Sequence, residues 1–385
     1  MSKKQLISLF LCVIVPYTVG NGLVPILPVY ATKMGAGPAL TGYYLSFAFL
    51  ALAIGTIVAG WLSDKLQRRK TILITDGIIL IPAIWLMGIA SNIWQLAVLT
   101  ATVWFLCGIQ ITLIHILAGL FAEENQRGKI FGILRLSVGL GMLIGGLISG
   151  PIVDLWGYPT MFKVFAIFSV ILPLTGVLLE DRVVVKISTD MLSPSRAHTG
   201  LTSAIFLLVI AVTVSQLSRF AGSMGRSLIM NEMGFATAAI SSTAAVTGAI
   251  SLPFYLLFGW LSDRVSRKRL IGLCYFAYSV GTLVLAFSVS LWQFYIFSAL
   301  MAFMSVSNSV GSALVTDLVP QESLGRGMSL FQAATWIGAI IGFSCAGYAF
   351  QNLGMTSSII FLAFLPLLAI ILLIPIRETK KKGEE

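Results

Sequence analysis

The sequence predicts an all-α membrane protein in which twelve transmembrane helices form two parallel repeats of six. Of its 385 residues, 57% are hydrophobic and 10% are charged, and the mean hydropathy of +0.95 exceeds what a water-soluble core requires. Twelve apolar segments are each long enough to cross about 30 Å of hydrocarbon. Motifs of the first half also return in the second half at one constant spacing, the 199 residues that separate Asp64 from Asp263.

The twelve segments are the apolar runs between short polar loops. In the first half they lie at roughly 6–31, 39–62, 71–90, 93–119, 129–153 and 159–179. In the second half they lie at roughly 202–230, 237–261, 269–289, 292–316, 327–350 and 355–376. The first run follows Lys3 and Lys4, but it is about 25 residues long and lacks a small-residue cleavage site. We therefore interpret it as a retained helix and not as a signal peptide.

Cationic residues predict the orientation of the chain in the membrane. Twenty of the 25 Lys and Arg residues lie at the termini or in the loops that follow even-numbered segments. By the positive-inside rule these loops and both termini are cytoplasmic. The net charge of +10 therefore reflects membrane topology, and no nucleic-acid partner is expected. The absence of Asn-x-Ser/Thr sequons and the short loops favour a bacterial cytoplasmic (inner) membrane.

The repeat predicts the domain organisation. Residues 60–65, Gly-Trp-Leu-Ser-Asp-Lys, return at 259–264 as Gly-Trp-Leu-Ser-Asp-Arg, and Arg127-Gly128 returns as Arg326-Gly327. Two parallel halves of equal length are typical of transporters in which two bundles rock about a central site. We expect an N-terminal six-helix bundle at 1–180, a polar cytoplasmic linker at 181–200 and a C-terminal six-helix bundle at 201–385.

No cofactor or metal site is predicted, and we do not expect an enzyme. The four cysteines are isolated in predicted helices and show no C-x-x-C spacing. A G-x-x-x-x-G-K-[ST] motif is absent, which excludes ATP hydrolysis by a P-loop. No Ser/His/Asp or metal-ligand set occurs at helical spacing.

The repeated motif resembles the signature of the major facilitator superfamily, G-x-L-[AS]-D-[RK]-x-G-[RK]-[RK], which follows the second helix in that family. Both copies match except that Gln67 and Ser266 replace the eighth-position glycine. The resemblance covers essentially the whole chain and implies the superfamily's twelve-helix fold and a cytoplasmic latch between the halves. The implied latch residues are Gly60, Asp64, Arg68, Arg69, Gly259, Asp263, Arg267, Lys268, Arg127 and Arg326. The alternative is that these cations only set the topology.

Within the superfamily, the sequence is most similar to twelve-helix bacterial drug and solute exporters. Gly22, Pro25 and Pro28 in the first segment follow a pattern of drug-exporting members. The R-x-x-Q-G motif that those exporters carry in helix 4 is not retained, because residues 104–108 read Trp-Phe-Leu-Cys-Gly. Gly150-Pro151 lies at the end of the fifth segment, whereas the exporters place Gly-Pro in the middle.

Ionisable residues inside the membrane are functional candidates, because an uncompensated charge there costs several kcal/mol. The acids are Asp76 and Asp154, and neither is expected near the midplane. We treat Asp76 and His115 as candidates for proton coupling. The alternative for His115 is a hydrogen bond within the bundle.

The seventh segment predicts one wall of a substrate cavity. Gln216, Arg219, Ser223 and Arg226 recur every three to four residues and share one helix face. The resemblance implies that this helix lines the central cavity, where the Arg219 guanidinium would bind a carboxylate or phosphate. Alternatively, Arg219 pairs with a carbonyl group, and Arg226 extends to the outer interface.

Further cavity candidates come from other segments. Arg135 lies in a stretch similar to the helix 5 pattern of sugar permeases, whose arginine contacts substrate; it could instead neutralise Asp76 or the latch. Tyr17, Asn21 and Asn308 are uncharged polar residues that could line the cavity or hold helices together. Aromatic candidates for the cavity walls are Trp104, Trp336, Phe331 and Tyr255.

These features predict a secondary active transporter that moves a small solute by alternating access. The resemblance favours efflux of small amphiphilic compounds, with proton antiport as its drive. The alternative is a transporter of an organic anion that uses Arg219, by symport, exchange or uniport. A remote alternative is a non-transporting sensor, which both intact latch motifs disfavour. The expected partners are the lipid bilayer, the small-molecule substrate and protons. We expect a monomer, because two six-helix halves complete one pathway.

Overall fold

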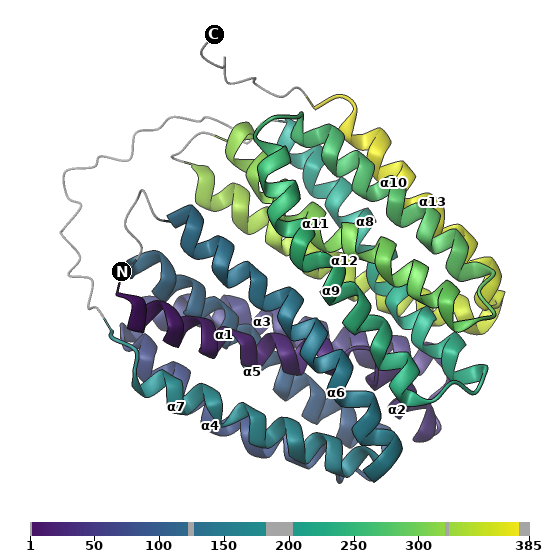
Figure 1. Ribbon diagram of the computed structural model, residues 1–385, viewed down its shortest axis with the longest axis horizontal. Helices are drawn as coiled ribbons and strands as arrows, with labels where there is room; N and C mark the ends of the chain where they lie inside the picture. The colour runs from purple at the N-terminus through teal and green to yellow at the C-terminus, as the bar shows by residue number, and fades with distance from the viewer. Residues whose placement is uncertain (1, 122–126, 182–202, 320–322, 377–385) are drawn as a thin grey trace.

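The computed structural model describes residues 2–121, 127–181, 203–319 and 323–376, and the regular structure in these ranges is entirely helical (Figure 1). The first half contains α1 (Lys3–Leu23), α2 (Leu27–Lys33), α3 (Pro38–Leu66), α4 (Arg69–Met87), α5 (Ile93–Phe121), α6 (Arg127–Ser169) and α7 (Ile171–Val177). The second half contains α8 (Ser203–Glu232), α9 (Thr237–Ser262), α10 (Arg267–Ala286), α11 (Leu291–Leu318), α12 (Leu324–Leu353) and α13 (Met355–Leu373).

Eleven of the described helices are long and apolar enough to cross a membrane. The predicted fifth and sixth segments both fall in α6 and its continuation α7, because α6 is continuous in hydrogen bonding but reverses at Gly157. Gly157 has a φ of +81°, a conformation that glycine adopts without strain. In the second half, Gly354 has a φ of +82° and separates α12 from α13. The twelve-helix prediction is therefore confirmed.

The predicted first segment is broken into two helices. Helix α1 ends at Leu23 and α2 begins at Leu27. Pro25 lies within this break and Pro28 lies in the first turn of α2, and neither can donate a backbone hydrogen bond to the preceding turn. The short α2 extends the first membrane crossing toward α8, which it contacts.

The sequence repeat is also visible in side-chain contacts. The Lys65 Nζ atom lies 4.7 Å from the centre of the Trp61 ring, and the Arg264 guanidinium lies 4.0 Å from the centre of the Trp260 ring. These two pairs are equivalent positions of the repeat, at the ends of α3 and α9. Both tryptophans are more than half exposed, at 59% and 53%. Cations stacked on exposed tryptophans are typical of a membrane–water interface.

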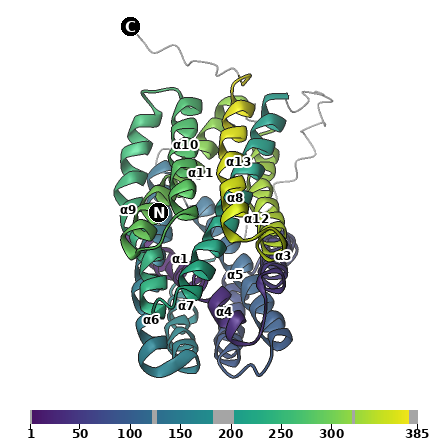
Figure 2. The same ribbon diagram turned by 90° about the vertical axis from the view of Figure 1, so that its right-hand side faces the viewer.

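The two halves meet through two pairs of helices. Figure 2 shows α9 beside α6 on one side and α12 beside α3 on the other, and both pairs are in close contact. Glycines allow these approaches. A Cβ atom on Gly146 would lie 2.5 Å from the backbone nitrogen of Ala245, and one on Gly347 would lie 2.6 Å from the carbonyl oxygen of Pro38.

The halves are tied together at one end, which we call the closed end. There the Asp154 carboxylate accepts hydrogen bonds from the backbone N–H groups of Thr237 (3.0 Å) and Ala238 (2.7 Å), at the start of α9. The closed end also holds hydrogen bonds from the Ala39 N–H to Gln351 Oε1 (3.1 Å) and from Asn231 Nδ2 to Thr32 Oγ1 (3.4 Å).

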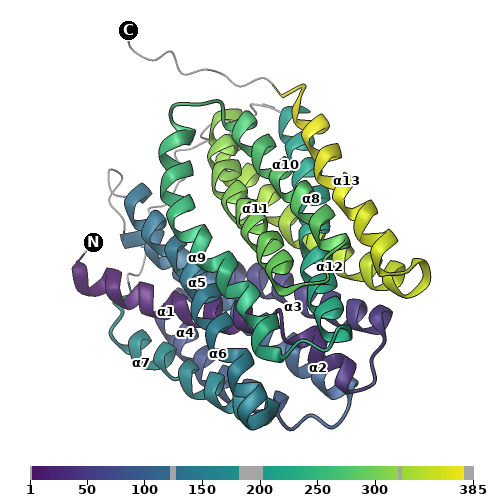
Figure 3. The same cartoon turned by 45° about the vertical axis from the view of Figure 1, so that its right-hand side comes forward.

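Toward the opposite end, which carries the N-terminus and the end of α13 and which we call the termini end, the two groups of helices diverge (Figures 1 and 3). Between described residues of the two halves, the hydrogen bonds nearest that end join Ser46 of α3 to the Ile340 carbonyl (2.7 Å) and to Ser344 (2.7 Å). The structure is thus closed at one end and splayed at the other.

Candidate functional site

A polar network surrounds Arg219 in the second half. Arg219 Nη1 donates to Gln216 Oε1 and Nη2 donates to Ser305 Oγ, both at 3.3 Å. Gln216 Nε2 donates to Asn308 Oδ1 at 2.9 Å. The helical spacing on α8 places Gln216 and Arg219 together, and α11 supplies Ser305 and Asn308. The Nε atom of Arg219 is buried without a partner among the described residues, so the guanidinium retains a donor that a ligand could use.

An aromatic cluster lies next to this network and bridges the two halves. It consists of Phe49 on α3, Trp104 on α5, Phe220 on α8, and Trp336 and Phe343 on α12. The Phe49 ring centre lies 5.0 Å from that of Phe220 and 5.1 Å from that of Phe343. The Arg219 guanidinium is 5.4 Å from the Phe220 ring centre. Trp336 Nε1 is a buried donor without a described partner.

Sequence reasoning identified two of these rings, Trp104 and Trp336, and missed Phe49, Phe220 and Phe343. Phe220 directly follows Arg219 in the chain, but phenylalanines are too frequent in apolar segments for that proximity to select it. Phe331, proposed as a wall, is buried and lies next to Gly311 on α11.

A second arginine approaches from the first half. Arg135 on α6 lies within electrostatic range of Tyr17 on α1 and of Tyr255 on α9. Tyr255 is also within range of Arg219 and close to Ser305. Tyr255 therefore lies within electrostatic range of guanidinium groups from both halves, and no described carboxylate forms an ion pair with either arginine. Asn21 is half-buried on α1, without a hydrogen bond to any described residue.

Arg226 is enclosed, although it shares the face of Arg219. Its side chain is 2% exposed, so it does not extend to the outer interface, and that alternative is wrong. Nη1 donates to Ser298 Oγ at 3.3 Å, and the guanidinium lies 6.0 Å from the Phe297 ring centre. Its Nε atom has no described partner. Ser223, which lies one turn before it, is also buried.

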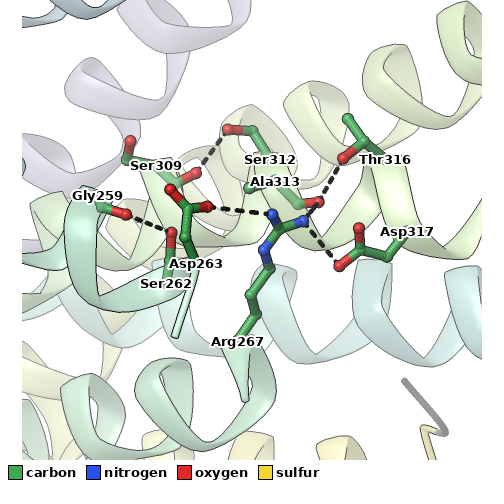
Figure 4. Close-up of polar contacts among 9 residues, drawn as sticks. All are labelled: Gly259, Ser262, Asp263, Arg267, Ser309, Ser312, Ala313, Thr316 and Asp317. Carbon is green, nitrogen blue, oxygen red and sulfur yellow. Dashed lines mark hydrogen bonds and ion pairs between the residues drawn. The ribbon is translucent and has the colours of Figure 1, made fainter. Parts of the chain in front are cut away.

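The second copy of the latch motif forms an ion-pair cluster (Figure 4). Arg267 Nη1 donates to Asp317 Oδ2 at 2.7 Å and to the Ala313 carbonyl at 2.6 Å, and Nη2 lies 3.7 Å from Asp263 Oδ1. Asp317, near the end of α11, was missed by sequence reasoning. Its position at the termini end of the tenth segment, level with the motif, is the signal that could have identified it.

Lys268, the next residue in the chain, caps the C-terminus of another helix in the same half. Its Nζ atom donates to the carbonyl groups of Ile374 (2.9 Å) and Ile376 (2.8 Å), at the end of α13. In the first half, Lys70 makes the corresponding contact with a helix C-terminus: its Nζ atom donates to the Val177 carbonyl at the end of α7 (2.6 Å). A cation at a helix C-terminus is favourable because of the helix dipole.

The first copy of the motif is arranged differently. Asp64 and Arg68 are exposed, whereas Arg69 is buried and donates from Nε to Ser63 Oγ at 2.7 Å. Gly60 and Gly259 have no neighbour where a Cβ atom would lie. Arg326 is exposed at the start of α12, and the side chain of Arg127 lies outside the described residues. The described contacts of both copies remain within their own half.

The two coupling candidates lie in separate surroundings. Asp76 on α4 is 4% exposed, and its Oδ2 accepts from Gln110 Nε2 of α5 at 2.6 Å. No described residue forms an ion pair with Asp76, so Arg135 does not neutralise it. His115 Nδ1 lies 2.6 Å from the Ile111 carbonyl one turn earlier in α5, and Arg135 is within electrostatic range of the ring. Gln110 was not identified from the sequence.

Comparison with known proteins places these features in context. The family model for the Major Facilitator Superfamily matches residues 9–190 and 204–385. The multidrug resistance protein MdtG of Serratia proteamaculans is 26% identical over 286 residues, which are 70% of this chain and 68% of the relative. The MdtG protein of Yersinia enterocolitica is 26% identical over 65% of this chain and 63% of the relative's length, which is slightly less than two thirds. The MdtG protein of Dickeya zeae is 23% identical over 83% of this chain and 81% of the relative's length.

Solved structures of transporters have the same fold. A D-xylose–proton symporter superposes with a TM-score of 0.78 at 16% identity and covers 98% of both chains. A POT family transporter in complex with 5-aminolevulinic acid gives a TM-score of 0.79 at 14% identity, over 96% of this chain and 95% of its own. At these identities the likeness concerns the arrangement of the helices.

Proposed function

Because the chain belongs to the Major Facilitator Superfamily, and so is a multi-pass membrane transporter and not an enzyme, we propose that it exports small amphiphilic compounds by alternating access. The observation that carries this proposal is the aromatic cluster, which lies at the junction of the halves beside the Arg219 network. Aromatic rings bind apolar bodies of varied shape, and the neighbouring polar groups orient them. The multidrug resistance proteins among the relatives support the same assignment.

The proposed cycle uses the two halves as moving units, at 1–180 and 201–385, joined by the linker at 181–200. With the termini in the cytoplasm of a bacterium, as the cation distribution predicts, the splayed termini end makes this an inward-facing conformation. Export would then require the closed end to open after substrate binds. We propose that the transporter works as a monomer in the inner membrane.

We propose that export is powered by antiport, in which the substrate leaves the cell in exchange for protons. Asp76 and His115 remain the two coupling candidates. His115 is held to a carbonyl group of its own helix, which leaves Asp76 as the group with an incomplete set of partners.

A second candidate function is transport of an organic anion. The observation that favours it is the pair Arg135 and Arg219, which approach Tyr255 from opposite halves without a described carboxylate. A guanidinium without an acidic partner favours a ligand that brings its own carboxylate or phosphate.

Ligand-dependent thermal unfolding of the purified protein separates the two functions. Lipophilic cations, neutral drugs, sugars and organic anions would be tested on the wild type, on Arg219→Gln and on Lys163→Gln, an exposed cation of α6 that serves as the matched control. A ligand at a hundredfold excess over Kd stabilises the folded state by about 2.7 kcal/mol. We expect stabilisation by cations or neutral amphiphiles that persists in Arg219→Gln. Stabilisation by anions alone that vanishes in Arg219→Gln, but not in Lys163→Gln, would replace efflux with anion transport.

A further inference from the structure

A buried carboxyl group, Asp76 on α4, is hydrogen-bonded to a buried amide group, Gln110 on α5, and each of the two groups has one oxygen without a described hydrogen-bond donor. Asp76 is 4% exposed and Gln110 is fully buried. Gln110 Nε2 donates to Asp76 Oδ2 at 2.6 Å. The second carboxyl oxygen, Asp76 Oδ1, and the single amide oxygen, Gln110 Oε1, are both buried, and neither accepts a hydrogen bond from a described residue.

An ionised Asp76 would not satisfy this arrangement. A carboxylate only accepts hydrogen bonds, as does an amide oxygen, so Oδ1 and Oε1 would both lack a donor. An ionised carboxyl buried without a cation is also strongly unfavourable. Among described residues, the groups on α5 near Asp76 are Gln110 and Cys107, and both are uncharged.

The charged groups of the elements packed around Asp76 are engaged elsewhere. On α4 itself, Arg69 lies two turns away and donates to Ser63, and the Lys70 Nζ atom donates to the Val177 carbonyl at the end of α7. On α5, His115 is held to the Ile111 carbonyl. Among the side chains described on α6, Lys163 is exposed, Asp154 accepts from the start of α9, and Arg135 lies within electrostatic range of Tyr17 and Tyr255. Helix α7 contains no charged residue.

A neutral Asp76 satisfies both groups at once. The amide then donates from Nε2 to Oδ2, while the acid donates its proton from Oδ1 to Gln110 Oε1, and each of the two vacant oxygens becomes the partner of the other. We propose that Asp76 carries a proton in this conformation and that the Asp76–Gln110 pair is the proton-binding site of the transporter. This inference names the coupling group of the proposed antiport and rests on it.

The repeat provides an internal comparison. The position equivalent to Asp76 in the second half is Tyr275, which is also buried, and the position equivalent to Gln110 is Ser309. The same architecture therefore forms without an acid or an amide at these places. The pair is a feature of the first half alone, as expected for a specialised group and not for a structural requirement of the fold.

The location of Gln110 links the proton to the substrate. Gln110 lies on α5, six residues after Trp104 of the aromatic cluster. Loss of the proton would leave the Gln110 oxygen facing a carboxylate oxygen, so the pair must separate or admit water when Asp76 ionises. A substrate that displaces α5 at Trp104 would therefore alter the proton affinity of Asp76, and ionisation would in turn displace α5.

Asp76→Asn provides a direct test, because its carboxamide can make both hydrogen bonds to Gln110 but cannot release a proton. Infrared spectroscopy of the purified protein should detect the C=O band of a buried protonated carboxyl group in the wild type. We expect this band to vanish in Asp76→Asn, to shift in Gln110→Leu, which removes the partner, and to persist in Glu232→Gln, the equivalent change at an exposed carboxylate that takes no part in the described contacts between the halves. A band that survives unchanged in Asp76→Asn would overturn the assignment.

Transport in proteoliposomes completes the test, with ethidium as the probe cation. In Asp76→Asn we expect ethidium exchange without a gradient to continue, and accumulation driven by a pH gradient to fall to the level seen without one. Accumulation that still follows the pH gradient would overturn the coupling role. If wild-type protein moves no ethidium, the proposed efflux of such cations is wrong, whereas the infrared band still decides whether Asp76 holds a proton.

Discussion

At the residue scale, Arg226 is the side chain whose energetics are most unusual. The residue is 2% exposed, and its guanidinium is bound by a serine hydroxyl and a methionine sulfur, without a described carboxylate. Removing a cation from water without an acidic partner is costly, and apolar replacements of buried charges are often stabilising.

We therefore predict that Arg226→Met raises the stability of the folded protein by about 1 kcal/mol or more. Thermal unfolding in detergent measures the change, and Lys163→Met, an exposed cation on α6, should leave the stability nearly unchanged. A lower stability of Arg226→Met would mean that the guanidinium has a compensating partner, such as a bound anion.

Helical spacing was sufficient to place Gln216 and Arg219 side by side, since both are on α8. It could not identify Ser305 or Asn308 as their partners, because those contacts depend on how α11 packs against α8. The same limit applies to Asp76. An isolated carboxyl in an apolar segment indicates a functional group, but Gln110 lies 34 residues away, and only the packing of α4 on α5 brings the two together.

At the scale of helices and their ends, the second latch motif connects α9, α10 and α11 through one guanidinium. The side chains of Arg267 and Asp317 are 21% and 25% exposed, and their atoms are 2.7 Å apart, whereas Asp263 is 74% exposed and 3.7 Å away. A half-buried, hydrogen-bonded pair contributes more than an exposed pair, which is screened by water and salt.

We predict that Asp317→Asn destabilises the protein by about 1 kcal/mol and that Asp263→Asn does so by less than about half of that. A double-mutant cycle between Arg267→Gln and each aspartate variant, followed by thermal unfolding, separates the two contacts. Equal coupling energies for both aspartates would contradict this ranking.

The twelve membrane crossings were predictable because hydrocarbon requires every backbone group to be bonded within the segment, which enforces long apolar helices. The breaks within crossings were less predictable. The α1–α2 break and the reversal at Gly157 depend on local backbone conformation, and Gly157 stands among several glycines of the same segment. The different use of the two latch copies also escaped prediction, since near-identical sequences leave Arg68 exposed in the first half, whereas its counterpart Arg267 binds Asp317 in the second.

At the scale of the whole molecule, we expect the balance between closed and open ends to depend on the glycine contacts between α6 and α9. A Cβ atom on Gly150 would overlap the Thr237 carbonyl oxygen and the Ser241 hydroxyl, both of the other half. A larger side chain there should force the closed end apart and shift the population toward the opposite conformation.

We predict that Gly150→Leu shortens the distance between spin labels at positions 65 and 264, which lie at the termini ends of α3 and α9. Pulsed dipolar spectroscopy in lipid measures this distance distribution. Gly132→Leu is the matched control, because it lies on the same helix and a Cβ atom there has no neighbour within 4 Å. An unchanged distribution in Gly150→Leu would mean that this contact does not set the conformational balance.

The hydrogen bond between Asn231 and Thr32 has an evolutionary consequence. The two residues are 199 positions apart, so each is the counterpart of the other in the repeat, and their contact marks the approximate twofold axis of the molecule. In an ancestral dimer of six-helix subunits, this position would face its own copy, and every substitution would alter both sides of the contact together. Fusion of two copies into one gene would remove that restriction and allow the two sides to differ, as the amide of Asn231 and the hydroxyl of Thr32 do here.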